Sequence, residues 1–205
     1  MSLDKLALTL ENFRQANLTC EKYLYGKIEK RTNSIYLQEI QEIKLSPELK
    51  FLYNNYDFDL TVGNNIILTN FNQLEKRQHG FSTFSTDGGE TQIPDPKWTS
   101  GWIVIADMND DPIVANTSIA GTPVLAAIEA VDYFEIAPSL DVFFQVLTEL
   151  LKSSELHRGN KPDGDEDFEK WVTYNEKVVQ PHFLKQISNI LNKQQLNNIE
   201  TFLFS

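Results

Sequence analysis

Three short apolar runs in the middle of the chain limit the possible folds more than any other feature. They cover residues 102–106, 113–115 and 124–128, and Asn, Asp, Gly or Pro residues bound each of them. Short runs rich in Val and Ile between turn residues are typical of strands rather than helices. Turns at this spacing predict an antiparallel meander, with a last short strand over 133–137.

A helix is predicted directly after this sheet. Ser139 is a suitable N-cap, Asp141 places an acidic side chain in the first turn, and apolar residues continue at helical spacing to about Ser154. The sequence Ser46-Pro47-Glu48 is a second helix start, because Ser caps and Pro fits the first helical position.

Further elements follow from weaker patterns. Helices are expected over 2–18 and 34–44 and from residue 69 or 70 to His79, and a hairpin over 58–68. Residues 28–33 are polar and are expected to form a connector, whereas 81–99 are expected to form a long, turn-rich loop. Loops of that length are usually functional or mobile. The helix over 2–18 is expected to lie on the domain, with binding to a partner as the alternative.

The end of the chain is predicted to be helical. Residues 155–167 interrupt the apolar pattern with Gly and Pro, and Pro181 is expected to break or kink the helix that follows. The predicted organisation is an α+β domain over 1–154 and a helical extension over 155–205 that packs on it.

The residues that punctuate the central stretch form an ordered pattern, W…GWIVIAD…DPI…PV…IAPS…F. Its fixed points are Trp98, Gly101, Trp102, Ile105, Pro112, Pro123, Pro138, Ser139 and Phe143. The pattern resembles the signature of the SUKH superfamily, which contains bacterial immunity proteins of polymorphic toxin systems and the fungal Smi/Knr cell-wall regulators. The resemblance covers roughly 45–151. One departure concerns a turn, because Glu129-Ala130 stand where many members carry His-Gly.

The resemblance implies both a fold and a class of function. The implied fold is α+β, an antiparallel or mixed sheet flanked by helices. The implied function is non-catalytic: an immunity protein binds a cognate toxin, often a nuclease or a deaminase, and covers its active site. The Smi/Knr relatives imply an alternative, a scaffold module that docks on ordinary intracellular proteins.

Charge favours a basic partner. The chain carries 18 basic and 29 acidic side chains, a formal net charge of −11. Such a surface repels nucleic acid and anionic membranes and attracts cationic proteins, although solubility alone would also explain it. The basic segments 27–31 and 76–77 are short and diluted by acid, so binding of nucleic acid is not expected.

One acidic cluster follows the first strand of the meander. Asp107, Asp110, Asp111 and Pro112 are expected to form a β-turn, and the three carboxylates would make an acidic rim available to a basic partner. Asp87 and Glu90, in the long loop, are further candidates for partner contacts. A second cluster, 163–167, resembles the start of a calcium loop but lacks the required Gly and Glu, since Phe168 and Tyr174 occupy those positions.

The sequence predicts no catalytic residue, metal site or cofactor. His79, His157 and His182 belong to no metal-binding or catalytic motif, and the single Cys20 excludes an internal disulfide. An enzyme with a site assembled from scattered residues such as Asp107, His79 and Trp102 is the remaining alternative.

The N-terminal residues lack the uncharged core of a signal peptide, because Asp4, Lys5 and Glu11 lie among the leucines. We therefore expect a cytoplasmic protein, monomeric or weakly dimeric, that neither spans nor binds a membrane.

Overall fold

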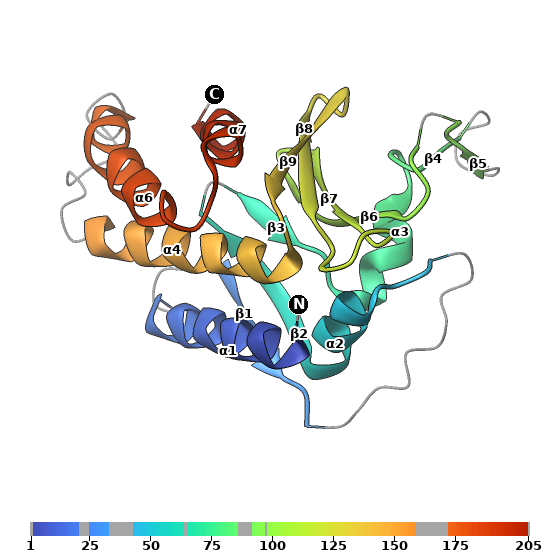
Figure 1. Cartoon of the computed structure of the whole chain (residues 1–205), viewed down its shortest axis with the longest axis horizontal. Coiled ribbons are helices and arrows are strands. Elements are labelled where there is room, and N and C mark those ends of the chain that lie inside the picture. Colours follow the sequence, from blue (N-terminus) through green and yellow to red (C-terminus); the bar gives the residue numbers. More distant parts are fainter. Residues whose placement is uncertain are drawn as a thin grey trace.

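The computed structural model describes residues 2–20, 25–32, 43–63, 65–85, 92–96, 98–158 and 172–204. These residues form an α+β fold around a seven-stranded antiparallel sheet, in the order β1-β2-β3-β6-β7-β8-β9 (Figure 1). A separate two-stranded sheet pairs β4 with β5. The α+β class and the antiparallel sheet agree with the prediction.

The strands of the main sheet are β1 (Tyr25–Lys30), β2 (Tyr56–Val62), β3 (Ile66–Leu68), β6 (Trp102–Met108), β7 (Asp111–Asn116), β8 (Val124–Ile128) and β9 (Asp132–Ala137), and the small sheet contains β4 (Thr83–Ser85) and β5 (Gln92–Pro94). The helices are α1 (Leu3–Cys20), α2 (Pro47–Asn55), α3 (Leu74–Gln78), α4 (Leu140–Arg158), α6 (Gln180–Ile187) and α7 (Lys193–Phe204), with a 3₁₀ turn η2 (Phe71–Gln73) and a π-helical turn η4 (Asn175–Val179). No helix in these described ranges is long and apolar enough to cross a membrane.

The predicted meander is present as β6 to β9, but its first turn is shorter than expected. β6 continues through Asp107 to Met108, and β7 already begins at Asp111, so only Asn109 and Asp110 form the turn. Asp107 and Pro112 are therefore opposite each other inside the sheet. The prediction that Asp107, Asp111 and Pro112 belong to the turn is wrong, because strand pairing continues across these residues as far as Met108 and Asp111.

The two predicted helix starts are confirmed. Ser46 Oγ accepts a hydrogen bond from Leu49 N at 3.2 Å, and Pro47 opens α2. Ser139 Oγ accepts from Val142 N at 3.2 Å ahead of α4. In both cases the cap satisfies an amide that the first helical turn leaves without a partner.

The predicted connector over 28–33 is wrong in its first part, since 25–30 form the edge strand β1. Ile28 is the one buried side chain described in this strand, and its amide donates to Asn17 Oδ1 of α1 at 3.1 Å. A strand that buries one face against a helix and leaves the other in water carries a weak apolar signal. The neighbouring prediction, a helix over 34–44, lies almost entirely outside the described residues.

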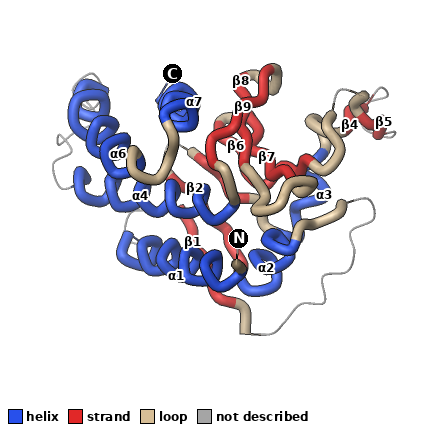
Figure 2. Tube along the Cα trace, in the orientation of Figure 1, coloured by secondary structure: helices blue, strands red, loops and turns tan. Residues whose placement is uncertain are grey.

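One hydrophobic core joins the sheet and the helices. Figure 2 shows α1 and α4 side by side along one side of the sheet, with α6 beyond α4. The core includes Phe13 of α1, Phe143 and Leu147 of α4, and Phe183 of α6. Gly63 permits close packing, because a Cβ there would lie 2.5 Å from Leu150 Cδ2 and its φ is +55°.

The C-terminal helices belong to this same core. α4 continues to Arg158, past its predicted end at Ser154, and α7 packs against β9. Ile199, Phe202 and Leu203 of α7 are almost fully buried. At Pro181 the chain does not break: the π-helical turn η4 precedes it, and this wider turn accommodates the missing N–H of proline. The acidic segment 163–167 lies outside the described residues.

Candidate protein-binding site

Three hairpin connections lie along one end of the main sheet. They join β2 to β3, β6 to β7 (residues 109–110) and β8 to β9 (residues 129–131), and they share this end because the strands run antiparallel in the order given above. Side chains connect neighbouring turns: Asn65 Nδ2 donates to Asn109 Oδ1 at 3.4 Å, and Glu129 N donates to Asp111 Oδ1 at 2.6 Å. The turns therefore form one continuous edge.

Four carboxylates stand on the second and third turns or next to them. They are Asp110, Asp111, Glu129 and Asp132, which we call the acidic rim. Asp110, Glu129 and Asp132 are exposed, and Asp111 is half-buried by its contact with the next turn. Val131 is 68% exposed at the tip of the third turn, so the rim also presents apolar surface.

The two turns of the rim differ in how well their residues suit the backbone. Asn109 and Asp110 have φ of 54° and 70°, and Asn and Asp adopt this left-handed region more readily than most residues. Glu129 and Ala130 have φ of 54° and 53°, which neither side chain favours. The third turn is therefore strained, and it is held by hydrogen bonds from Glu129 N to Asp111 Oδ1 and from Val131 N to Ile128 O at 3.3 Å.

Asp107 does not lie on the rim. It is 2% exposed, on the outer face of β6, and its carboxylate pairs with the guanidinium of Arg77 from α3. A buried carboxylate requires such a partner because desolvation of the free charge is costly. The structure thus separates Asp107, which joins α3 to the sheet, from Asp110 in the turn and Asp111 at the first position of β7.

Gln78, next to Arg77, completes the edge of β6 where β3 is too short to pair with it. Its side chain donates to Val104 O at 3.0 Å and accepts from Val104 N at 2.9 Å, as a neighbouring strand would. Gln78 and Arg77 therefore fix α3 to β6, Gln78 at the edge of the strand and Arg77 on the outer face of the sheet. Sequence analysis missed both roles, because their partners lie 26 and 30 positions further along the chain.

Three aromatic side chains meet beside this region. Trp98 precedes β6, Trp102 begins β6, and Tyr133 belongs to β9; together we call them the aromatic cluster. The ring centroids are 5.8 Å apart for Trp98 and Trp102, 5.9 Å for Trp98 and Tyr133, and 4.6 Å for Trp102 and Tyr133. All three side chains are partly exposed. Sequence analysis assigned the tryptophans to a family motif and gave Tyr133 no role beyond a strand.

The electrostatic surroundings of the cluster are acidic. Burial, and after it the charge of Asp95, raises the pKa of the Tyr133 phenol to about 12. The Asp95 backbone is tied to the cluster, because its carbonyl accepts from Trp98 N at 3.0 Å. At neutral pH Tyr133 is therefore an uncharged aromatic group close to a carboxylate.

The other motif residues have structural positions. A Cβ on Gly101 (φ +85°) would lie 2.1 Å from Ser118 Oγ, so only glycine fits there. Ile105 and Phe143 are in the core. Pro123 is buried, its carbonyl accepts from Asn116 N at 2.8 Å, and Pro138 is exposed ahead of the Ser139 cap.

The predicted contacts Asp87 and Glu90 lie outside the described residues. The two strands that flank them, β4 and β5, are paired, and Phe84 and Ile93 face each other across this hairpin. Their side chains are 43% and 37% exposed. The long connection thus contains a small hairpin with an exposed apolar pair.

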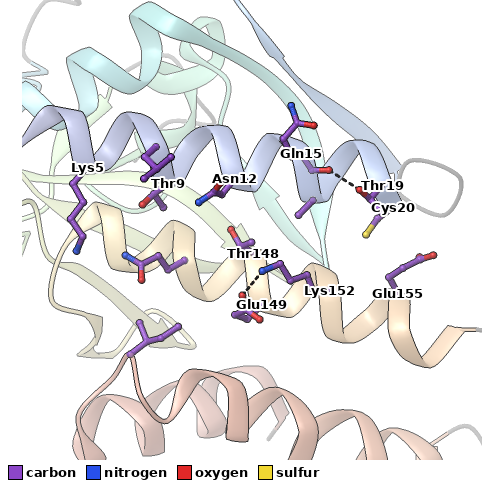
Figure 3. Close-up of a pocket in the computed structure, with 14 residues that line it drawn as sticks. Lys5, Thr9, Asn12, Gln15, Thr19, Cys20, Thr148, Glu149, Lys152 and Glu155 are labelled. Carbon is purple, nitrogen blue, oxygen red and sulfur yellow. Dashed lines mark hydrogen bonds and ion pairs between the residues drawn. The ribbon is translucent and has the colours of Figure 1, made fainter.

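A groove of about 840 Å³ lies between α1 and α4 (Figure 3), and Ile190 is among the residues that line it. Its cations are paired: Lys5 lies 2.8 Å from Asp141 and Lys152 lies 2.7 Å from Glu149. Leu8 of α1 lines the groove and is 64% exposed. This is the face of α1 that a partner would meet if the helix were a binding element.

The residues named for an enzyme do not form a catalytic arrangement among the described contacts. Asp107 is engaged by Arg77, Trp102 belongs to the aromatic cluster, and His79 is exposed at the end of α3. Within the described ranges, no three His, Cys, Asp or Glu side chains are grouped so that they could hold a metal ion.

Compared with known proteins, the chain matches no protein-family model, no curated protein and no solved structure.

Proposed function

We propose that the protein is a SUKH-type immunity protein, which binds a basic toxin domain of the nuclease or deaminase type and covers its active site. The observation that carries the proposal is the acidic rim on the connected turns of the sheet. Residue order in the central stretch, from Trp98 to Phe143, supports the same assignment through its resemblance to the superfamily.

The rim suits recognition of a cationic groove. A nuclease binds phosphates with basic side chains, and carboxylates on a protruding edge can take the place of those phosphates. Opposite charge also accelerates encounter, by factors between about 10 and 1,000 at low salt. A net charge of −11 gives the whole chain the sign that such steering requires.

The test begins with the partner isolated from the native host, expressed alone and together with this protein. The proposal expects the partner to stop growth when expressed alone and growth to return on co-expression. A partner that binds but is not toxic would contradict the immunity role and favour the Smi/Knr-type scaffold function.

A charge-neutral rim variant shows whether the rim makes the contact. The variant D110N/D111N/E129Q/D132N keeps side-chain size, and the amide introduced at position 111 keeps an oxygen that can accept from Glu129 N. Its matched control, D4N/D59N/E75Q/E176Q, removes the same four charges from exposed positions elsewhere. We expect association to slow on the order of 10-fold in the rim variant and much less in the control. Equal slowing in both variants would show that the rim acts only through the net charge of the protein and does not contact the partner.

A further inference from the structure

The aromatic cluster has the features of a binding site for a cationic side chain. Trp98 is close to perpendicular to both of its neighbours, with interplanar angles of 85° to Trp102 and 89° to Tyr133. At centroid distances of 5.8 and 5.9 Å these are edge-to-face contacts, in which the rings pack on one another. The face of each ring carries the negative part of its quadrupole, and all three side chains are partly exposed, so a cation can lie against the ring surface that remains open.

The rings are held in place by the fold. Trp98 Nε1 donates to Trp102 O at 3.1 Å, which fixes the loop residue against the start of β6. Tyr133 is anchored by strand pairing with Ala127 of β8. A site that is formed before binding loses little side-chain entropy when a ligand arrives.

The nearby charges favour a cation of the partner over an anion. Burial raises the pKa of the Tyr133 phenol first, and the charge of Asp95 raises it further, so this carboxylate acts on the cluster. Arg77, a cation of this protein on the same outer face, is engaged by Asp107. An arginine suits the site better than a lysine, because its planar guanidinium stacks on aromatic faces and sheds water more readily.

We propose that the cluster of Trp98, Trp102 and Tyr133, with Asp95 beside it, binds an arginine side chain of the protein partner. This inference rests on the proposed function, since it names the anchor with which the same basic partner would be held. The rim would then govern the rate of encounter, and the cluster would govern the lifetime of the complex.

The cluster can be tested without the partner. The probe is N-acetyl-arginine amide, titrated into ¹⁵N-labelled protein at constant ionic strength while the indole N–H signals of Trp98 and Trp102 are followed. N-acetyl-citrulline amide has the same shape without the charge and is the matched control ligand. We expect saturable shifts with the arginine compound, with a dissociation constant on the order of 1–10 mM, and no saturation with citrulline.

Three variants of the protein sharpen the result. Tyr133→Leu should weaken binding about 10-fold, Tyr133→Phe should leave it nearly unchanged, and Asp95→Asn should weaken it about 3-fold. Phe84→Leu, at an exposed aromatic position on the β4–β5 hairpin, is the matched control and should have no effect. Equal shifts with citrulline, or full binding by Tyr133→Leu, would overturn the proposal.

The experiments distinguish failure of the arginine-binding proposal from failure of the immunity proposal. If arginine amide does not bind but the toxin is still neutralised, the cluster is not the anchor and the proposed function stands. With the toxin in hand, Tyr133→Leu should raise the dissociation rate about 10-fold with little change in association. An unchanged dissociation rate would contradict the anchor.

Discussion

The two faces of strands β6 to β9 carry different kinds of side chains. On the core face, Ala106, Ile113 and Ala126 stand in one row, and each is at most 1% exposed beneath the helices. On the outer face, Asp107 pairs with α3 and Tyr133 stays partly exposed with the tryptophans. The core face is committed to folding, whereas the outer face and its rim keep rings and carboxylates that a partner can reach.

The largest expected effect is a difference in stability between substitutions on the two faces. Phe143→Ala on α4 removes a fully buried ring that packs against Phe144 at 5.7 Å, and should lower the free energy of unfolding by about 3–5 kcal/mol. Tyr133→Leu on the outer face should cost about 1 kcal/mol or less, because the ring is only partly buried. Denaturant unfolding measures the free energy of unfolding of both variants. Equal losses would contradict the distinction between a core face and an outer face.

The next effect concerns the pair that joins α3 to the outer face. Arg77→Ala leaves the Asp107 carboxylate buried without its partner and should lower the free energy of unfolding by about 2 kcal/mol. The double variant R77A/D107N should recover part of this loss, because the remaining amide is neutral. A double variant that is no more stable than Arg77→Ala would show that the charge pair is not the cause.

The turns of the rim provide a smaller effect of opposite sign. Replacing Glu129-Ala130 by Asn-Gly relieves two strained residues and should stabilise the protein by about 1 kcal/mol. The matched change in the neighbouring turn, Asp110→Gly, should alter stability by only a few tenths of a kcal/mol, since Asn and Asp already suit that backbone. Thermal unfolding of the two variants compares the turns directly.

The smallest effect is a dependence on alkaline pH. Burial raises the pKa of Tyr53, Tyr56 and Tyr133, the last to about 12. Their contribution to stability is present below the unfolded-state pKa near 10 and is lost as pH rises above it, because the unfolded chain ionises first. Tyr133→Phe should make the loss shallower above pH 10, as measured by denaturant unfolding at several pH values. A steeper loss would contradict the sign of the shift.

Much of the fold could be predicted because the relevant signals are local. The caps Ser46 and Ser139 and the strands of the meander act within a few residues of themselves. β1 was missed because Ile28 is the one buried side chain among those that the structure describes in this strand, so its sequence resembles that of a polar loop. The burial of Asp107 was missed because Arg77 lies 30 positions away, although the alternation Ala106-Asp107-Met108 carried a sign that the strand continued.

The candidate site was predictable only in part. Asp110 is in the turn that its residue type favours, and Asp111 begins the strand that follows it. Glu129, Asp132 and Tyr133 join them through the register of β8 and β9, which sequence spacing alone does not define.

The most direct test of the central claim is a stopped-flow measurement of association and dissociation rates with the isolated partner. It compares the wild type, the rim variant and Tyr133→Leu at several salt concentrations. The account predicts that neutralising the rim lowers the association rate and its salt dependence, while Tyr133→Leu raises the dissociation rate. Rates unchanged in both variants would contradict the assignment of binding to this edge and face of the sheet.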